Sequence, residues 1–283
     1  MSNTSKPVMI RKASGELECF EPIKLLRSLN RAGADEKTAY QILIDIESIL
    51  THGVSTRKIY KKALSLLRQK TKSAAGRYRI KDAIMELGDT GRPFEIFTGE
   101  VYKRLGYEVE TGIIVDGKSI THEMDVIATS NKVQHLIECK YSKLQGKYVS
   151  IQVPLYVHSR VNDIIAYRSE QEKYIGFTFT AGVATNTRFS PDCISYASDY
   201  KLRLLSWNYP EGESLRELIE KERILPITIL NTLNRHEKDY IISHDIVTCE
   251  QLVQNSFILD KICLSRKKNQ TVRIELDAAL QKK

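Results

Sequence analysis

Charged side chains stand inside two apolar segments that follow one another, and this arrangement constrains the fold more than any other feature. The first segment, about 120–128, contains Asp125, and the second, about 133–141, contains Glu138 and Lys140. Charges embedded in apolar strands are unusual unless they are paired or bind a ligand. We therefore predict two neighbouring strands that carry a functional site.

The spacing of these residues places them together on a hairpin. Because side chains alternate along a strand, Glu138 and Lys140 share one face. A two-residue turn at Asn131-Lys132 pairs residues symmetrically and sets Asp125 opposite Glu138. Two carboxylates on adjacent strands can hold Mg²⁺, and a nearby ammonium can orient water and offset developing negative charge. The alternative interpretation of the same residues is an exposed cross-strand ion pair.

Further elements are predicted on both sides of this hairpin. Pro93 suits the first position of a helix that Gly106 ends. Residues 107–115 alternate as a strand and end at a hairpin turn. Another helix is expected near Pro154 and another strand at 178–185. The order predicts an α/β domain with a central mixed sheet flanked by helices.

Residues 91–207 resemble the Mrr-type branch of the PD-(D/E)XK nuclease superfamily. The resemblance implies a Mg²⁺-dependent phosphodiesterase that acts on double-stranded DNA. The matching strings are Phe94-Glu95, Leu105-Gly106-Tyr107, His122-Glu123-Met124-Asp125-Val126-Ile127-Ala128 and Ile137-Glu138-Cys139-Lys140-Tyr141.

The resemblance also implies roles for single residues. Asp125 and Glu138 take the metal-binding positions, and Glu95 takes an acidic position on the preceding helix. Cys139 is expected to bury its thiol on the opposite face and to offer its backbone carbonyl to the metal. Lys140 takes the catalytic lysine position, and Gln152 lies near a position where the family often has glutamine. The catalytic positions that the resemblance implies are Glu95, Asp125, Glu138, Lys140 and Gln152.

The first ninety residues are predicted to form a small α+β domain. Short strands precede helices that begin at Pro22, Asp35 and Ser55, and a fourth helix is expected at 74–87. This stretch resembles the ATP-cone domain of ribonucleotide reductases. The matching residues are Arg11-Lys12, Gly15, Glu18, Phe20, Lys24, Thr56 and Ile59.

The second resemblance implies a nucleotide site. Lys12 and Lys24 would contact the phosphates, with Glu18 and Thr56 near the bound nucleotide. The sequence has no glycine-rich Walker loop, so we expect ATP or dATP to act as an effector and not as fuel. A generic helical domain with exposed lysines is the alternative.

Net charge is concentrated in this first stretch. Residues 1–90 carry 17 Lys/Arg against 10 Asp/Glu, a balance of +7, whereas residues 91–213 carry 14 against 15, a balance of −1. The basic segment 57–81 could meet an anionic polymer or could be a solvated helix face.

The last seventy residues are predicted to be helical. Ser214, Asn234 and Thr248 begin capping boxes, and short helices are expected at 224–233, 235–243 and 250–255, with a solvated turn at 266–268. Residues 246–253 faintly resemble a helix-hairpin-helix DNA-binding element. Asp245 stands where that motif normally has glycine.

Composition excludes several classes of protein. The five cysteines (Cys19, Cys139, Cys193, Cys249 and Cys263) form no Cys-x-x-Cys pair, which argues against a zinc knuckle and a disulfide scaffold. No apolar run approaches the ~20 residues of a membrane span, and no signal-peptide core is present. We expect a cytoplasmic protein.

The prediction for the whole chain is an α/β, multi-domain, nucleotide-regulated DNA endonuclease of restriction type. The expected domains are an ATP cone (1–90), a nuclease core (91–210) and a helical module (211–283). We expect Mg²⁺ as cofactor, double-stranded DNA and a nucleotide effector as partners, and a homo-oligomer. The alternatives are a nucleotide-sensing DNA-binding regulator with an inactive core and a structure-specific repair nuclease.

Overall fold

The computed structural model describes residues 8–12, 15–144, 146–262 and 264–280. The chain divides into two compact units, Met1–Asp82 and Ala83–Lys283. Among the described residues, none of the helices combines the length and apolar character needed to cross a bilayer. Cys19, Cys139, Cys193 and Cys249 are free thiols, whereas Cys263 lies outside the described residues.

The first unit contains a small sheet in the order β2-β1-β3 and a set of amphipathic helices. β1 is antiparallel to β2 and parallel to β3. The side chains of Asp35 and Ser55 accept hydrogen bonds from backbone N–H groups at the starts of α2 and α3, so both predicted caps are confirmed. The elements are β1 (Met9–Arg11), β2 (Leu17–Cys19), α1 (Pro22–Arg31), α2 (Glu36–Glu47), β3 (Val54–Ser55), α3 (Thr56–Lys70) and α4 (Lys72–Tyr78), and α5 (Ile80–Met85) contains the boundary between the two units.

The helix predicted at 74–87 is wrong as a single element. The backbone of Arg79, at φ −95° and ψ 14°, leaves the helical region and separates α4 from α5. Strand β3 escapes prediction because two residues are too few to show a period of two.

A five-stranded mixed sheet, in the order β4-β5-β6-β7-β8, forms the centre of the second unit, as predicted. β4, β5 and β6 are antiparallel neighbours, whereas β6, β7 and β8 run parallel. The β5–β6 turn has φ of 48° at Asn131 and 61° at Lys132, the left-handed pair that a two-residue hairpin turn requires. The strands are β4 (Glu108–Asp116), β5 (Thr121–Ser130), β6 (Val133–Lys140), β7 (Thr178–Thr185) and β8 (Arg203–Leu205).

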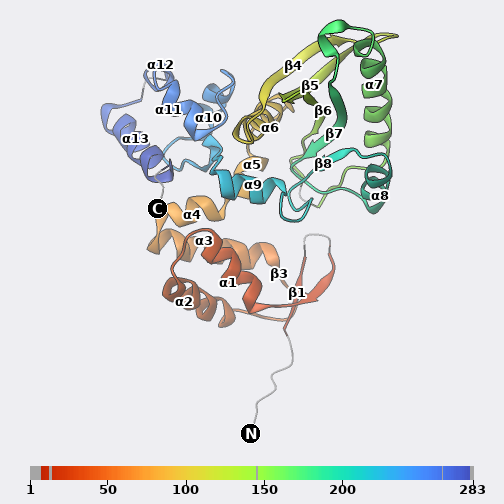
Figure 1. Ribbon diagram of the computed structural model, residues 1–283. Coiled ribbons are helices and arrows are strands. Elements are labelled where there is room, and N and C mark those ends of the chain that lie inside the picture. The colour runs from red at the N-terminus through yellow and green to blue at the C-terminus, as the bar shows by residue number, and fades with distance from the viewer. Residues whose placement is uncertain (1–7, 13–14, 145, 263, 281–283) are drawn as a thin grey trace. The chain divides into compact units, whose positions relative to one another are not determined.

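Helices cover both faces of this sheet (Figure 1). On one face α6 lies close to β4, because a Cβ at Gly99 would stand 2.9 Å from the Cγ2 of Thr111. On the other face Val157 and Val161 of α7 join an apolar core with Leu136 and with residues of α8. These helices are α6 (Arg92–Arg104), α7 (Gln152–Arg168) and α8 (Pro191–Asp199), and η1 (Glu172–Tyr174) is a 3₁₀ turn between α7 and β7.

The C-terminal part is helical, as predicted. Ser214, Asn234 and Thr248 each form a complete capping box. The helices are α9 (Leu215–Glu222), α10 (Arg235–Ile242), α11 (Cys249–Gln254), α12 (Ile258–Lys261) and α13 (Arg266–Leu280).

Two predictions for this part are wrong. Residues 224–233 contain only the 3₁₀ turn η2 (Ile227–Ile229), because Pro226 is extended and forms a bridge with Thr248. Residues 266–268 are not a solvated turn but the first turn of α13. Lys268 there forms an ion pair with Glu237 at 2.6 Å, which ties α13 to α10.

Candidate functional site

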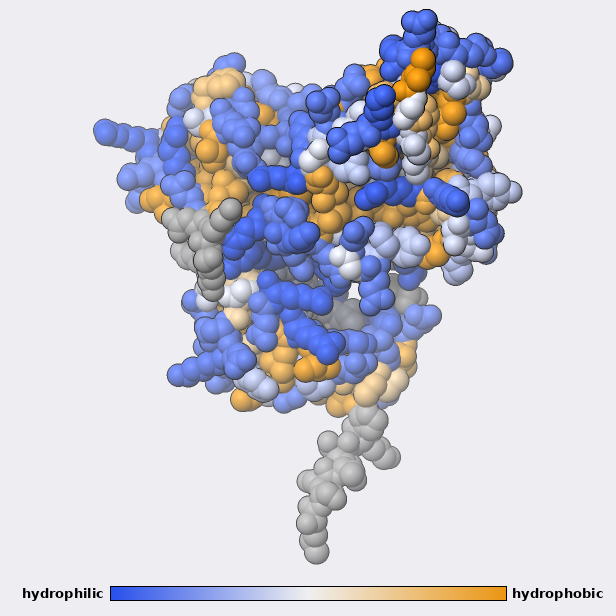
Figure 2. Space-filling model, in the orientation of Figure 1, coloured by the Kyte–Doolittle hydropathy of each residue, from blue (hydrophilic) through white to orange (hydrophobic). Residues whose placement is uncertain are grey.

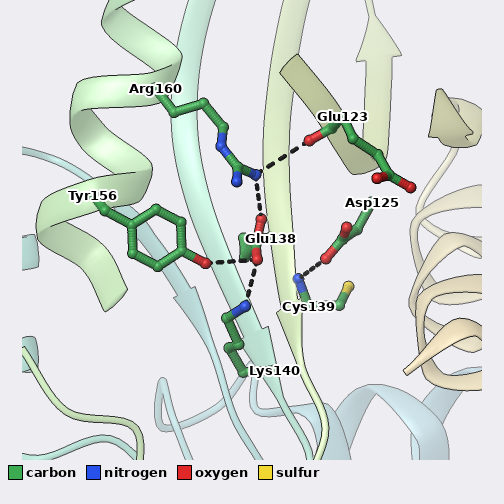
Figure 3. A network of polar contacts seen from close by, with 7 residues as sticks. All are labelled: Glu123, Asp125, Glu138, Cys139, Lys140, Tyr156 and Arg160. Carbon is green, nitrogen blue, oxygen red and sulfur yellow. Dashed lines mark hydrogen bonds and ion pairs between the residues drawn. The ribbon is translucent and has the colours of Figure 1, made fainter. Parts of the chain in front are cut away.

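The β5–β6 hairpin brings the predicted acidic pair together. The β5–β6 ladder ends at the pair Val126–Ile137, and Asp125 and Glu138 are the next residues on their strands. Asp125 Oδ2 accepts a hydrogen bond of 2.7 Å from the backbone N–H of Cys139. Figure 3 shows the Asp125 carboxylate directed at the β6 backbone, with Glu138 on the neighbouring strand.

Glu138 is the centre of a network of charged and polar groups. Its side chain is buried, with a relative exposure of 5%. Oε1 accepts from Lys140 Nζ at 2.5 Å and from Tyr156 Oη at 2.6 Å, and Oε2 accepts from Arg160 Nη1 at 2.6 Å. A carboxylate can accept about four hydrogen bonds, and Glu138 already accepts three. About one acceptor position therefore remains free, and it is on Oε2.

Two of these partners, Tyr156 and Arg160, were missed in the sequence. Both reach Glu138 from α7 (Figure 3). Arg160 also donates to the backbone carbonyl of Glu123 at 3.1 Å, which ties α7 to β5. Gln152, Tyr156 and Arg160 are spaced four apart and so share one side of the helix. This spacing from Gln152 was the signal by which Tyr156 and Arg160 could have been found in the sequence. Gln152 itself is the first residue of α7, and its side chain is exposed.

Burial and neighbouring negative charge raise the pKa of two carboxyl groups in this region. Burial raises the pKa of Asp125 to about 6, and the charge of Glu138 adds to the effect. Burial, reinforced by Asp125, raises the pKa of Glu95 on α6 to about 7. A cation placed among these groups would relieve their repulsion.

Lys140 remains a cation in this environment. Burial lowers the pKa of its ammonium, but hydrogen bonds with Glu138 and Tyr156 outweigh burial and leave the pKa above its ordinary value. Lys140 is therefore suited to holding Glu138 and offsetting negative charge, and it is poorly suited to removing a proton from water.

The donor set fits Mg²⁺ with few protein ligands. Among the described residues, no three or more His, Cys, Asp or Glu side chains gather as a metal site, so Glu95, Asp125 and Glu138 do not surround one point. Mg²⁺ commonly binds through one or two carboxylates and keeps several waters. Asp125 and Glu138, with the Cys139 carbonyl, satisfy that requirement.

Cys139 and His122 are two further residues of β6 and β5 with buried or partly buried side chains. Cys139 is buried, as expected, and burial raises the pKa of its thiol well above the ordinary value, which makes the thiol inert. His122 forms a 2.8 Å contact with Asp163 of α7.

The first unit brings two of the four predicted nucleotide-binding residues, Lys12 and Glu18, into direct contact. Lys12 forms an ion pair of 2.5 Å with Glu18 on β2. Arg11 is in register with Ser55, and Thr56 then begins α3. The hydrogen bond from Lys12, aided by the charge of Lys24, lowers the pKa of Glu18. The ammonium of Lys24 itself pairs with Glu21 at 2.8 Å.

Comparison with known proteins shows the family of the chain. Residues 225–278 match the family model described as AF1548-like, C-terminal. An uncharacterized protein of Archaeoglobus fulgidus is 32% identical over 171 residues, which cover 60% of this chain and 92% of that protein. The chain belongs to the AF1548-like family.

A solved structure of an AF1548 protein agrees with this membership. A crystal structure of a protein of unknown function, AF1548, is 28% identical with a TM-score of 0.54, over 66% of this chain and 97% of that chain. MspJI restriction endonuclease, solved in complex with a 27-mer oligonucleotide, is 13% identical with a TM-score of 0.25, over 60% of this chain and 37% of that chain. Overlap as low as that with MspJI supports no conclusion about activity, and the AF1548-like relatives are themselves uncharacterized.

Proposed function

We propose that this AF1548-like chain is a Mg²⁺-dependent endonuclease that hydrolyses phosphodiester bonds of double-stranded DNA. The observation that carries the proposal is the β5–β6 hairpin, in which Asp125 accepts a hydrogen bond from Cys139 N–H, next to a buried Glu138 whose carboxylate holds Lys140. Two carboxylates and an ammonium at one point of a sheet suit hydrolysis of an anionic ester.

Each residue has a defined role in this proposal. Asp125 and Glu138 would hold Mg²⁺, with the Cys139 carbonyl as a further ligand, and the ion would supply Lewis-acid stabilisation of the phosphate oxygens. Lys140, kept charged by Glu138, offsets negative charge on the phosphate. Tyr156 and Arg160 hold the Glu138 carboxylate in place. Glu95, with a pKa of about 7, is suited to exchanging a proton near neutral pH.

The proposal includes regulation by ATP or dATP bound to the first unit. Lys12 and Lys24 would contact the phosphates, with Glu18 and Thr56 beside the nucleotide. Support comes from the ion pair of Lys12 with Glu18 and from the electrostatic influence of both lysines on Glu18. The ammonium groups would exchange their present carboxylate partners for phosphate oxygens.

One observation favours a second candidate, a DNA-binding regulator with an inactive core. Glu138 is already bonded to three donors, two of them cations, which leaves its charge compensated without a metal. Incubation of the purified chain with plasmid, linear and branched DNA, with Mg²⁺ or chelator and with or without ATP, separates the candidates. Mg²⁺-dependent strand breaks support the endonuclease, whereas DNA binding without breaks under every condition supports the regulator. Cleavage of branched DNA alone would indicate a structure-specific repair nuclease.

Replacing Lys24 by Ala is expected to weaken ATP binding about tenfold, because one charge-assisted contact to phosphate is lost. Basal cleavage should not change, since Lys24 is in the first unit and its exposed pair with Glu21 contributes little to stability. Titration of the full chain with a fluorescent ATP analogue measures the effect. Lys37→Ala on α2 removes another exposed lysine of the same unit and is the matched control. Equal affinities in the two variants would remove Lys24 from the nucleotide site.

A further inference from the structure

Helix α3 of the first unit has an unusual charge composition. Its fifteen residues contain six Lys or Arg and no Asp or Glu. Its apolar side chains face the core of the unit, with Ile59, Ala63, Leu64 and Leu67 all buried. The remaining surface of the helix is therefore a cationic face.

The cations of α3 gather on one side. At about 100° per residue, Arg57, Lys58, Lys61, Lys62 and Arg68 fall within an arc of about 140°. All five are exposed, and none forms an ion pair with any residue that the structure describes. At about 1.5 Å per residue, this basic face extends for roughly 16 Å along the helix. Figure 2 shows hydrophilic side chains on the part of the first unit where Figure 1 places α3.

The concentration of positive charge on α3 destabilises the helix. Acidic residues are favoured in a first turn, where they complement the helix dipole, but α3 has none there and carries Arg57 and Lys58 instead. Ordinary surface helices also interleave acidic residues that form i,i+4 pairs. The cations of this face repel one another and form no ion pairs within the described part of the chain. Binding of an external anion would explain why the helix has this composition.

We infer that the basic face of α3 binds the phosphate backbone of double-stranded DNA. The neutral side chains within the arc are Ser65 and Gln69, which can also donate to phosphate oxygens. A row of exposed, unpaired cations about 16 Å long matches a polymer that carries one charge per about 1.7 Å of its axis. The choice of DNA as the polymer rests on the proposed function, whereas the binding surface itself does not depend on the β5–β6 site.

Other anionic partners fit this face less well. A membrane-binding helix needs large apolar side chains beside its cations, and no large hydrophobic residue of α3 is exposed. Protein interfaces are depleted in lysine and enriched in aromatic residues, whereas the arc contains three lysines and no aromatic residue. Contact with a repeating phosphate backbone remains the best match.

The test is binding of a labelled DNA duplex by the full chain in chelator, followed by fluorescence anisotropy over a range of salt concentrations. In the variant Lys58→Gln/Lys61→Gln/Lys62→Gln, we expect affinity to fall at least about tenfold at about 0.1 M salt, and the salt slope to fall by about three. Glutamine maintains helix propensity, and circular dichroism verifies the fold.

The matched control is Arg27→Gln/Arg31→Gln/Lys37→Gln, which removes three exposed cations from α1 and α2 of the same unit. Affinity should fall by less than about threefold in this control. Equal losses in both triple variants would overturn the inference, because they would reflect net charge alone. Binding to vesicles of anionic lipid without binding to the duplex would also overturn it.

The two proposals fail in distinguishable ways. Duplex binding that depends on α3, together with no cleavage in Mg²⁺, leaves this inference standing and removes the endonuclease. Cleavage with normal affinity in the α3 variant removes the inference and leaves the endonuclease.

Discussion

Replacement of Asp125 by Asn, or of Lys140 by Ala, is expected to lower Mg²⁺-dependent DNA cleavage by roughly a hundred- to a thousandfold. Asp125→Asn removes one of two anionic ligands offered to the metal. Lys140→Ala removes the cation that Glu138 holds at 2.5 Å and that would offset charge on the phosphate. Conversion of supercoiled plasmid to nicked and linear forms measures the loss.

The control for Lys140 is Lys143→Ala. Lys143 lies three residues further along the chain and pairs with Asp89, away from Glu138. This variant should retain activity within about threefold, since an exposed ion pair contributes little. Full activity in Lys140→Ala or in Asp125→Asn would contradict the assigned roles.

Neutralising the two acids of the candidate centre is expected to change the free energy of unfolding in opposite directions. Glu138→Gln leaves Lys140 and Arg160 beside a neutral amide. Loss of one partner from a fully buried ion pair costs about 3–5 kcal/mol. Because Lys140 is 38% exposed and Arg160 26% exposed, we expect a smaller loss, of about 2–3 kcal/mol.

Asp125→Asn should instead stabilise the metal-free protein above pH 6. The folded-state pKa of Asp125, about 6, lies above its ordinary value of 3.8, so the unfolded chain binds fewer protons between these pH values. The contribution of Asp125 to the stability of the wild-type protein therefore falls as pH rises from about 4 to about 6. Removing the charge should restore about 1–2 kcal/mol at pH 8 and change little at pH 4.

Thermal melts in chelator at pH 8 and pH 4 test both expectations. A change of 1 kcal/mol moves the Tm by about 2–4 °C in a protein of about 200 residues. Glu123→Gln, at an exposed site on β5, is the control and should change stability by less than about 0.5 kcal/mol. If Glu138→Gln left stability unchanged, the ion pairs of that carboxylate with Lys140 and Arg160 would not stabilise the fold, and the prediction would be wrong.

Local signals in the sequence predicted the parts of the fold that depend on few residues. Asn131-Lys132 fixed the hairpin register because both residues adopt positive φ, and Ser214, Asn234 and Thr248 fixed helix starts through their capping boxes. The turn alone predicts that Asp125 and Glu138 lie on neighbouring strands, and the β5–β6 ladder follows the predicted register as far as Val126 and Ile137.

Contacts between elements far apart in the chain could not be predicted from the sequence. Tyr156 and Arg160 reach Glu138 only because α7 crosses the sheet at that point, and no periodicity encodes the crossing. Lys268 similarly finds Glu237 only after α13 has folded onto α10. A run of three cations near the end of a chain gives no local indication of such a partner.

The central claim is that Asp125 and Glu138 together bind a hard divalent cation, and calorimetric titration with Mg²⁺ tests it most directly. Wild-type chain should bind the ion at one site of the second unit, Lys143→Ala should bind equally well, and Asp125→Asn and Glu138→Gln should each weaken binding at least about tenfold. Equal heats and equal affinities in all four proteins, or no binding to the wild-type chain, would contradict the account.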